Sequence, residues 1–356
     1  MTKKPGRLAL LSAFGAVYLI WGSTYLGIRY AIESIPPLLM AGSRFAVAGA
    51  VLLLLGRLRD GSRPDRAEWG SAALTGILLL GVGNGGVTWS EQIVPSGIAA
   101  LVASIVPLWM ALMDWARPGG ARPTLLTMAG LILGMAGLFV LIGGDWGSMA
   151  LDGGGAGVAL GMTALIVATI GWALGSVMAS HVRLPSSPLT AIGAQMAVGG
   201  GALLLAGLLS GEAARFDPAL VTTRSLLAWG YLVVFGAWIG FSAYVWLLRN
   251  TTAAKASTYA FVNPLVAVIL GVWLGSEPFS PRTAVAVAVI LSGVALIVLT
   301  RSRRGADRGA GRPHDRTATS LPREGDDLAP LAPGDVDPLA RRPARPRRRK
   351  TKGEIA

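Results

Sequence analysis

The sequence contains no cysteine and only two histidines, His181 and His314. Without cysteine the chain has no disulfide framework, no thiolate metal site and no cysteine nucleophile. The two histidines fall in a polar connection and in the C-terminal tail, so the apolar body has no residues for a histidine metal centre or a Ser-His-Asp arrangement. We therefore expect neither a metal nor a cofactor.

Charged residues are also scarce. They make up 14% of the 356 residues, whereas 53% are hydrophobic and the mean hydropathy is +0.57. This composition lies outside the usual range of soluble domains. The net charge of +13 would suggest a nucleic-acid partner in a soluble protein, but most of the charges fall in short connections and in the tail. We expect a protein that lies in a lipid bilayer and binds no nucleic acid.

The tail, residues 301–356, has no apolar run and is rich in Arg, Pro, Asp and Gly. A segment of this composition cannot bury a core, which predicts disorder. Two interpretations of its basic end stay open. The end is either solvated without a specific partner, or it lies on anionic lipid at about 1 kcal/mol per basic residue.

The rest of the chain divides into apolar runs separated by short connections. A helix needs roughly 20 mostly apolar residues to cross a bilayer. Ten runs meet this criterion, which predicts an all-α integral membrane protein with ten transmembrane helices. The predicted spans are residues 8–28, 38–56, 69–89, 97–114, 124–142, 158–178, 189–209, 226–247, 256–275 and 281–300. The first run is too long for a signal peptide and is interpreted as a retained helix.

Basic residues in the short connections predict the orientation, because they concentrate on the cytoplasmic side. If the N-terminus is cytoplasmic, the outside receives only Arg29, Arg215, Arg224 and Arg282. The inside receives fifteen: Lys3, Lys4, Arg7, Arg57, Arg59, Arg63, Arg66, Arg117, Arg122, Arg183, Arg249, Lys255, Arg301, Arg303 and Arg304. We predict that both termini are cytoplasmic and that the protein is a multi-pass protein of the cell membrane.

The two halves of the chain resemble each other. Trp21 pairs with Trp172 and Pro37 with Pro188 at an offset of 151, and Pro107 pairs with Pro264 at an offset of 157. This predicts two repeats, residues 8–142 and 158–300, with five spans each. An odd number of spans inverts the second copy. Inverted repeats give a scaffold two near-equivalent conformations, each open to one side, which favours a carrier; a membrane-embedded enzyme and a passive channel are the alternatives.

Several segments resemble a known family. They are Val17–Ile28, Pro36-Pro37, Ser43–Ala46 and the segments around Pro107 and Pro264. These motifs are similar to those of the drug/metabolite transporter superfamily, EamA type, and the resemblance covers residues 8–300 without the tail. It implies ten helices in two inverted repeats, a central cavity, alternating access, and export of amino acids, metabolites or drugs across a bacterial inner membrane.

Arg44 is the clearest candidate for function, because a charge within a predicted span is costly unless it faces a cavity or a partner. It could pair with Glu91 or bind an anionic group of the substrate. It could equally be a snorkelling or gate-closing arginine that never touches substrate. Its counterpart in the second repeat is Gln195, so the charge differs between the halves.

Other polar and aromatic residues within spans are candidates for lining a cavity. They are Trp21, Ser23, Thr24, Asn84, Tyr244, Tyr259 and Asn263. Pro107 and Pro264 each free a backbone carbonyl one turn earlier and are expected to kink their helices there. Trp89, Trp109 and Trp246 are interpreted as interfacial anchors or packing residues.

Glycine-rich stretches are interpreted as helix contacts. Gly81–Gly86 contains G-x-G-x-x-G, but no strand precedes it, which excludes a dinucleotide site. Close helix packing explains it, as it explains several G-x-x-x-G pairs such as Gly271/Gly275.

Glu91 and Glu277 lie near outer span ends, where each could titrate and couple transport to a proton gradient, although solvation in a loop explains them equally. Taken together, the residues predict a transporter of small organic molecules such as amino acids, nucleobases or amphipathic drugs. The oligomeric state is left open.

Overall fold

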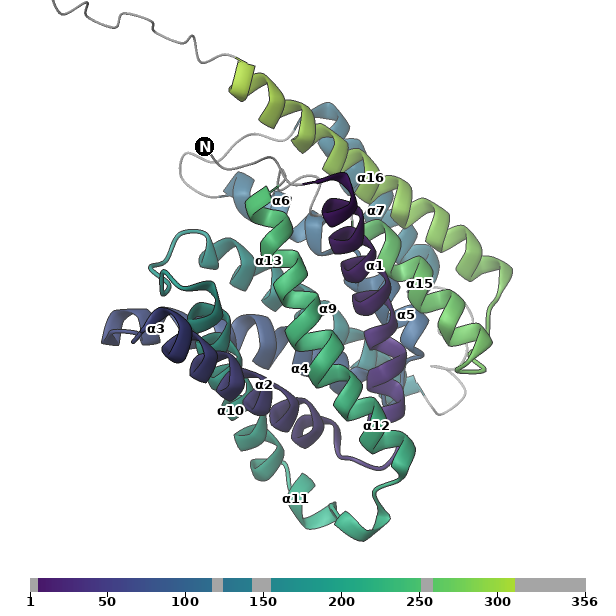
Figure 1. Ribbon diagram of the computed structural model, residues 1–356. Helices are drawn as coiled ribbons and strands as arrows, with labels where there is room; N and C mark the ends of the chain where they lie inside the picture. The colour runs from purple at the N-terminus through teal and green to yellow at the C-terminus, as the bar shows by residue number, and fades with distance from the viewer. Residues whose placement is uncertain (1–5, 117–123, 143–154, 251–258, 311–356) are drawn as a thin grey trace, which may run out of the picture. The chain divides into compact units, whose positions relative to one another are not determined.

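The computed structural model describes residues 6–116, 124–142, 155–250 and 259–310. Within these residues all regular structure is helical, and none of it is strand. Helices distant in the sequence pack against one another, such as α1 against α15 and α2 against α10 (Figure 1). The prediction of an all-helical chain is confirmed for the described residues.

The helices follow one another with short connections. The first half contains α1 (Arg7–Ala31), α2 (Pro37–Asp60), α3 (Arg66–Gly76), the π-helical segment η1 (Ile77–Asn84), α4 (Gly85–Ser90), α5 (Ser96–Ala103), α6 (Val106–Ala116) and α7 (Leu125–Ile142). The second contains α9 (Gly155–Ala179), α10 (Pro188–Leu209), α11 (Glu212–Arg215), the short 3-10 turn η3 (Pro218–Leu220), α12 (Thr223–Tyr231), the π-helical segment η4 (Leu232–Gly240), α13 (Phe241–Asn250), α15 (Tyr259–Trp273) and α16 (Pro281–Ala310).

Seven helices in the described part of the chain are long and apolar enough to cross a membrane. They are Arg7–Ala31, Pro37–Asp60, Arg66–Ser90, Ser96–Met113, Ala156–Ala179, Pro188–Leu209 and Thr223–Tyr244. Three shorter apolar helices, Leu125–Gly137, Val262–Trp273 and Pro281–Leu296, lie within the remaining predicted runs. The structure is therefore consistent with a membrane protein, whereas ten spans, their repeats and the side of the termini stay predictions.

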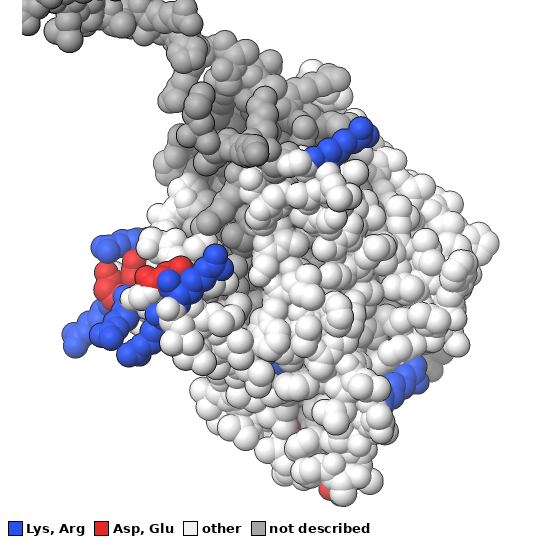
Figure 2. Space-filling view, in the orientation of Figure 1, with Lys and Arg blue, Asp and Glu red and all other residues white. Residues whose placement is uncertain are grey.

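The outer surface of the helices is apolar. Large hydrophobic side chains on several helices face outward, among them Leu19 (63% exposed), Phe139 (80%) and Leu209 (81%). The face shown in Figure 2 carries few charges apart from a group at one edge. Such a surface would be costly in water and is suited to lipid tails.

Charged side chains gather where α3 begins. The Asp65 carboxylate accepts from the Glu68 N–H at 2.8 Å and the Glu68 carboxylate accepts from the Asp65 N–H at 3.0 Å. This reciprocal capping box satisfies two backbone donors and starts the helix. Arg183, which precedes α10, lies 3.1 Å from Asp65, so the connection before α10 is held against the start of α3.

Helices α2 and α10 touch backbone to backbone. A Cβ atom placed on Gly42 would lie 2.6 Å from the Leu204 nitrogen, and one on Gly49 would lie 2.5 Å from the Ala197 nitrogen. From the other side, a Cβ on Gly193 or Gly200 would lie 2.8 Å or 2.6 Å from a backbone nitrogen of α2. Only glycine permits this approach.

Gly42 and Gly49 of α2 are seven residues apart, and so are Gly193 and Gly200 of α10. Seven residues make about two helical turns, so the two glycines of each helix lie on one face of it. Gly193 and Gly200 follow Gly42 and Gly49 by 151 positions, the same offset that relates Trp21 to Trp172. The sequence interpretation had considered only glycines four apart and therefore missed the contact that joins α2 to α10.

Part of the predicted tail is helical. α16 continues to Ala310, past the predicted boundary at residue 300, because extending a formed helix needs no new nucleus. Residues 311–356, with their predicted disorder and lipid contact, lie outside the described residues. The same holds for Lys3, Lys4, Arg117, Arg122 and Lys255, on which the predicted orientation partly rests.

The α2–α10 contact predicts opposite effects for two neighbouring glycines of α10. In Gly200→Ala the new methyl group would lie 2.6 Å from the Ala46 nitrogen, whereas in Gly201→Ala it would meet nothing within 4 Å. We expect Gly200→Ala to lose about 1–3 kcal/mol through overpacking. Gly201→Ala should be neutral or gain up to about 1 kcal/mol of helix propensity.

Thermal unfolding of the two purified variants in one detergent would measure the difference. Equal melting temperatures would contradict the close approach of the two backbones.

Candidate functional site

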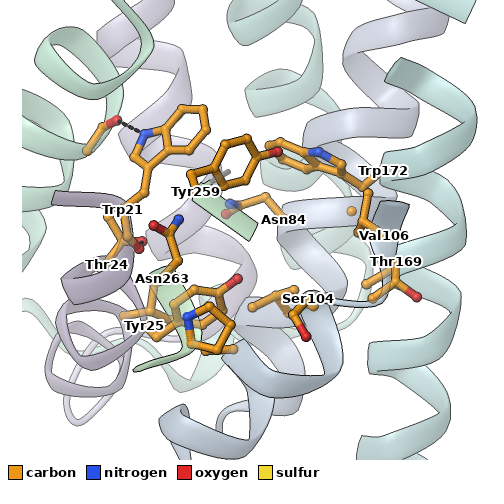
Figure 3. A pocket seen from close by; sticks show the side chains of 18 of the residues that line it. Trp21, Thr24, Tyr25, Asn84, Ser104, Val106, Thr169, Trp172, Tyr259 and Asn263 are labelled. Atoms are coloured by element: carbon orange, nitrogen blue, oxygen red, sulfur yellow. Dashed lines mark hydrogen bonds between the residues drawn. The ribbon is translucent and has the colours of Figure 1, made fainter. Parts of the chain in front are cut away.

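A cavity of about 900 Å³, including its open mouth, lies among helices of both halves. α1, α2, η1, α4, α5 and α6 contribute from the first half, and α9, η4, α13 and α15 contribute from the second. Figure 3 shows Trp21, Tyr259 and Trp172 along one side, and Tyr25 together with amide and hydroxyl groups along the rest. The cavity thus combines apolar rings with a few polar groups, which is typical of small-molecule sites.

Most of the residues predicted from the sequence line this cavity. They are Trp21, Thr24, Arg44, Asn84, Tyr259 and Asn263, together with Pro107 and Pro264. The structure brings them together from helices far apart in the chain.

Trp21 organises the aromatic side of the cavity. Its indole N–H donates to the Gly236 carbonyl at 3.3 Å (Figure 3). The centroid of its ring lies 5.2 Å from that of Tyr259 and 5.1 Å from that of Tyr244. The contact with Tyr259 is edge-to-face and that with Tyr244 is tilted, and aromatic pairs of this kind add stabilisation beyond the buried area. Tyr244 is not among the lining residues and supports the wall from behind.

Asn263 is buried and ties α15 to α1. In the amide orientation that satisfies both of its ends, its nitrogen donates to the carbonyl oxygens of Tyr18 at 3.3 Å and Tyr259 at 3.2 Å. Asn84, on the opposite side, accepts a weak hydrogen bond from Thr88 at 3.4 Å. An amide in an apolar helix needs such partners, and each amide still borders the cavity.

Two π-helical segments reach the cavity, one from each half. η1 contributes Gly83 and Asn84, and Gly236 of η4 accepts the hydrogen bond from Trp21. π-Helices are rare and frequently mark functional sites, because the extra residue in a turn shifts the side chains that follow. Nothing in the hydropathy pattern distinguishes these segments from ordinary α-helix.

Ser23 and Gln195 do not line the cavity. The Ser23 hydroxyl bonds the Leu19 carbonyl at 2.7 Å and lies within hydrogen-bond distance of the Tyr231 hydroxyl. The Gln195 amide donates to the Thr75 hydroxyl at 2.8 Å. Both side chains connect helices, which is an alternative way to satisfy a polar group in lipid.

Arg44 borders the cavity and is only 3% exposed. Its Cζ lies 4.6 Å from the centroid of the Phe45 ring. Within the described residues no carboxylate oxygen lies within 4 Å of its guanidinium, so the predicted ion pair with Glu91 is not formed. Its Nε and Nη1 are buried without a hydrogen-bond partner.

Glu91 is fully buried, one residue beyond the apolar span that ends at Ser90. Neither of its carboxylate oxygens has a hydrogen-bond partner. Burial, and then the charge of Glu277, raise the pKa of Glu91 well above its ordinary value, and Arg29 and Arg44 oppose this only in part. The protonated form is favoured because a buried carboxylate loses its hydration.

Glu277 caps a helix. Its carboxylate accepts from the backbone N–H groups of Ser96 at 2.7 Å and Gly97 at 2.9 Å, at the start of α5. Ser276, just before it, has φ of 52°, a left-handed conformation rare outside glycine. Glu212, which the sequence interpretation did not single out, caps α2 in the same way through Leu38 and Leu39. Both carboxylates thus bind helix N-termini of the other half of the chain.

The sequence interpretation missed several lining residues, notably Tyr25, Ser104, Thr169 and Trp172. Trp172 carried a usable signal, because it is the repeat counterpart of Trp21. Ser104 and Thr169 carried none. Their hydroxyls bond the carbonyls of Leu101 and Ile166 in their own helices, as isolated hydroxyls in apolar helices commonly do.

Comparison with known proteins connects the chain to a family. Residues 7–143 and residues 159–299 each match the EamA-like transporter family. This chain belongs to that family.

Similar proteins carry transporter names. The chain is 41% identical over 293 residues to "Uncharacterized inner membrane transporter YedA" of Escherichia coli (strain K12), covering 82% of this chain and 91% of that protein. It is 24% identical over 291 residues to "Uncharacterized transporter YvbV" of Bacillus subtilis (strain 168), covering 82% and 91%. A crystal structure with 22% identity aligns with a TM-score of 0.57 over 83% of this chain and 99% of the other, which shows a common fold alone.

The EamA-family chain is accordingly a multi-pass inner-membrane protein. The names of the family and of its relatives indicate a transporter rather than an enzyme.

The cap on α5 predicts a stability effect for Glu277. Glu277→Ala removes the acceptor of two backbone N–H groups, which we expect to cost about 1–3 kcal/mol. Glu277→Gln keeps one acceptor oxygen, so its stability should lie between that of the wild type and that of Glu277→Ala. Thermal unfolding measures the loss, with Glu33→Ala as the control, because Glu33 forms an exposed ion pair with Arg224 at 3.3 Å and should cost under about 1 kcal/mol. A loss no larger than that of the control would refute the cap.

Glu91 predicts a pH dependence of stability. Its pKa is higher in the folded protein than its ordinary value of 4.5, so the folded state holds the proton more tightly. The resulting stability is present at low pH and is lost as the pH rises from about 4.5 toward the raised pKa. The melting temperature of the wild type should therefore fall over this interval. Glu91→Gln, which is always neutral, should remove that part of the fall; parallel pH profiles would contradict the assignment.

Proposed function

We propose that this protein carries small organic molecules across the inner membrane by alternating access between two inverted five-helix repeats, residues 8–142 and 158–300. The observation that carries the proposal is the cavity, which receives lining residues from both halves. A site between two repeats is the arrangement that lets rocking of one half against the other expose the same residues to either side.

The contacts between α2 and α10 support inverted repeats. The Cβ position of Gly42 faces the nitrogen of Leu204, and that of Gly193 faces the nitrogen of Leu53. Each residue of the second contact lies 151 positions from its counterpart in the first. The glycine of the first half contacts the leucine of the second, and the glycine of the second half contacts the leucine of the first. Two halves related by a two-fold axis make pairs of contacts of this kind. The π-helical segments η1 and η4 lie in the third predicted span of each half, at equivalent positions, which also supports the repeats.

The predicted orientation gives the caps a role. With both termini in the cytoplasm, Glu212 and Glu277 lie at the outer ends of their helices. Each joins one half of the chain to the other there, through the starts of α2 and α5. We propose that these contacts help to hold the outer side closed and that they break when the cavity opens outward.

A few side chains of the cavity are suited to bind a substrate. Trp21 and Tyr259 offer ring faces and edges, Asn84 and Thr24 offer hydrogen bonds, and Arg44 offers a charge. These groups suit amino acids, nucleobases and amphipathic drugs, and the direction that we propose from the resemblance is export. A passive channel is the alternative that an experiment must exclude.

A disulfide can test alternating access, because the chain has no cysteine of its own. A Cβ on Gly97 of α5 would lie 3.2 Å from the Cα of Val268 on α15, which is close enough for a cross-link between the halves. In proteoliposomes we expect saturable uptake of at least one class among labelled amino acids, nucleobases and organic acids. Oxidation of the Gly97→Cys/Val268→Cys protein should reduce that uptake at least tenfold, and a reductant should restore it.

The two single-cysteine variants and the oxidised wild type are the controls. Full uptake by the cross-linked protein would contradict alternating access, and uptake that never saturates would favour a channel.

A further inference from the structure

Arg44 is the one charged side chain among the described residues that line the cavity. An arginine stays charged under all ordinary conditions. Because the side chain is only 3% exposed and its Nε and Nη1 have no hydrogen-bond partner, its charge is poorly compensated. A buried charge of this kind is expensive unless an anion meets it.

The described surroundings of Arg44 supply no carboxylate in contact with its guanidinium. The Phe45 ring covers one side of the guanidinium, and a ring face is no substitute for a carboxylate. Gly236, which also lines the cavity, packs against Nη2, because a Cβ on it would lie 3.2 Å both from that nitrogen and from Cγ2 of Thr24. Glu91, whose charge acts on Arg44, is buried, does not line the cavity and has no oxygen within 4 Å of the guanidinium.

The rest of the described wall has no carboxylate to attract a cation, and the attraction of its ring faces for a cation is opposed by the charge of Arg44. No aspartate or glutamate is among the described lining residues, whereas Trp21, Tyr25, Trp172, Phe241 and Tyr259 present aromatic surface. A cationic ligand would be repelled by Arg44 and would find no carboxylate. A planar apolar body fits among the rings, and an oxyanion fits at the guanidinium.

We propose that Arg44 forms the subsite for the carboxylate of an organic monoanion whose planar, apolar body lies among the aromatic residues of the cavity. This inference rests on the proposed transport function and narrows its substrate class. A ligand amine is not required, and a net positive charge is selected against.

A matched series of probes tests the charge preference in the wild type alone. Phenylacetate, phenylacetamide and 2-phenylethylamine share a ring and a chain length but carry a negative, zero and positive charge. Trp21 and Trp172 line the cavity, so quenching of tryptophan fluorescence in detergent reports binding. We expect phenylacetate to bind at least about tenfold more tightly than phenylacetamide, and 2-phenylethylamine to bind most weakly. Equal or reversed affinities, or no binding of phenylacetate, would overturn the proposal.

A second pair of probes isolates the amine. 3-Phenylpropionate and phenylalanine differ only by the α-amino group, and we expect 3-phenylpropionate to bind at least as tightly. Tighter binding of phenylalanine would show that the cavity recognises an ammonium group, which would overturn the assignment to monoanions.

Variants then assign the preference to Arg44. Arg44→Gln should remove the advantage of phenylacetate, and Arg44→Lys should keep part of it, provided that each elutes as a single species in size exclusion. Arg224→Gln is the control, because Arg224 is 53% exposed and pairs with Glu33 outside the cavity. An unchanged preference in Arg44→Gln would refute the subsite.

Uptake of the same probes into proteoliposomes separates this proposal from the transport proposal. Anion-selective binding without uptake would contradict transport and leave the subsite standing. Uptake of phenylacetamide or 2-phenylethylamine in preference to phenylacetate would support transport and overturn the subsite.

Discussion

Lipid offers no hydrogen bonds, so each polar group that enters the bilayer must find its partner within the protein. This constraint explains most polar contacts of the structure. The hydroxyls of Ser104 and Thr75 bond carbonyls of the preceding turn, and the Gln195 amide reaches across to a neighbouring helix. At two helix starts the orphan backbone donors bind carboxylates from the other half of the chain, and the chain's two halves are thereby joined.

The same constraint makes backbone contact possible between helices. A helix has satisfied its own backbone, so two helices can approach until only glycine fits, as α2 and α10 do at Gly49 and Gly193. In lipid, where hydrophobic burial between helices gives little, such close packing is a main source of association. Side chains of both helices, among them Phe45 and Met196, pack together beside the four glycines.

Among the described residues, four side chains carry a buried polar atom that has no hydrogen-bond partner, namely Arg44, Glu91, Ser96 and Thr190, and two of them can carry a charge. Arg44 and Glu91 are charged or chargeable, buried, and without hydrogen-bond partners. Structural polar groups are rarely left in this state, because an unsatisfied buried group costs more than a satisfied one stabilises. Arg44 borders the cavity and Glu91 does not. We infer that the uncompensated charge of Arg44 at the wall of the cavity is kept for an anionic ligand that comes and goes.

The apolar runs are enough to establish that the chain is helical and lies in the membrane, because only in a helix does such a run satisfy its backbone hydrogen bonds within lipid. The sequence also identified Arg44, Trp21, Asn84 and Asn263, since polar and aromatic residues are few within such runs. Which of these residues face a common cavity depends on how the helices pack, and this is seen only in the folded protein. Hydropathy indicates which residues lie within the membrane, but it does not indicate which other helix a given side chain contacts. Ser23 therefore contacts Tyr231 of another helix instead of the cavity, whereas Trp172 lines the cavity. Glu212 accepts a hydrogen bond at the start of α2 from Leu39, which is 173 residues away in the sequence.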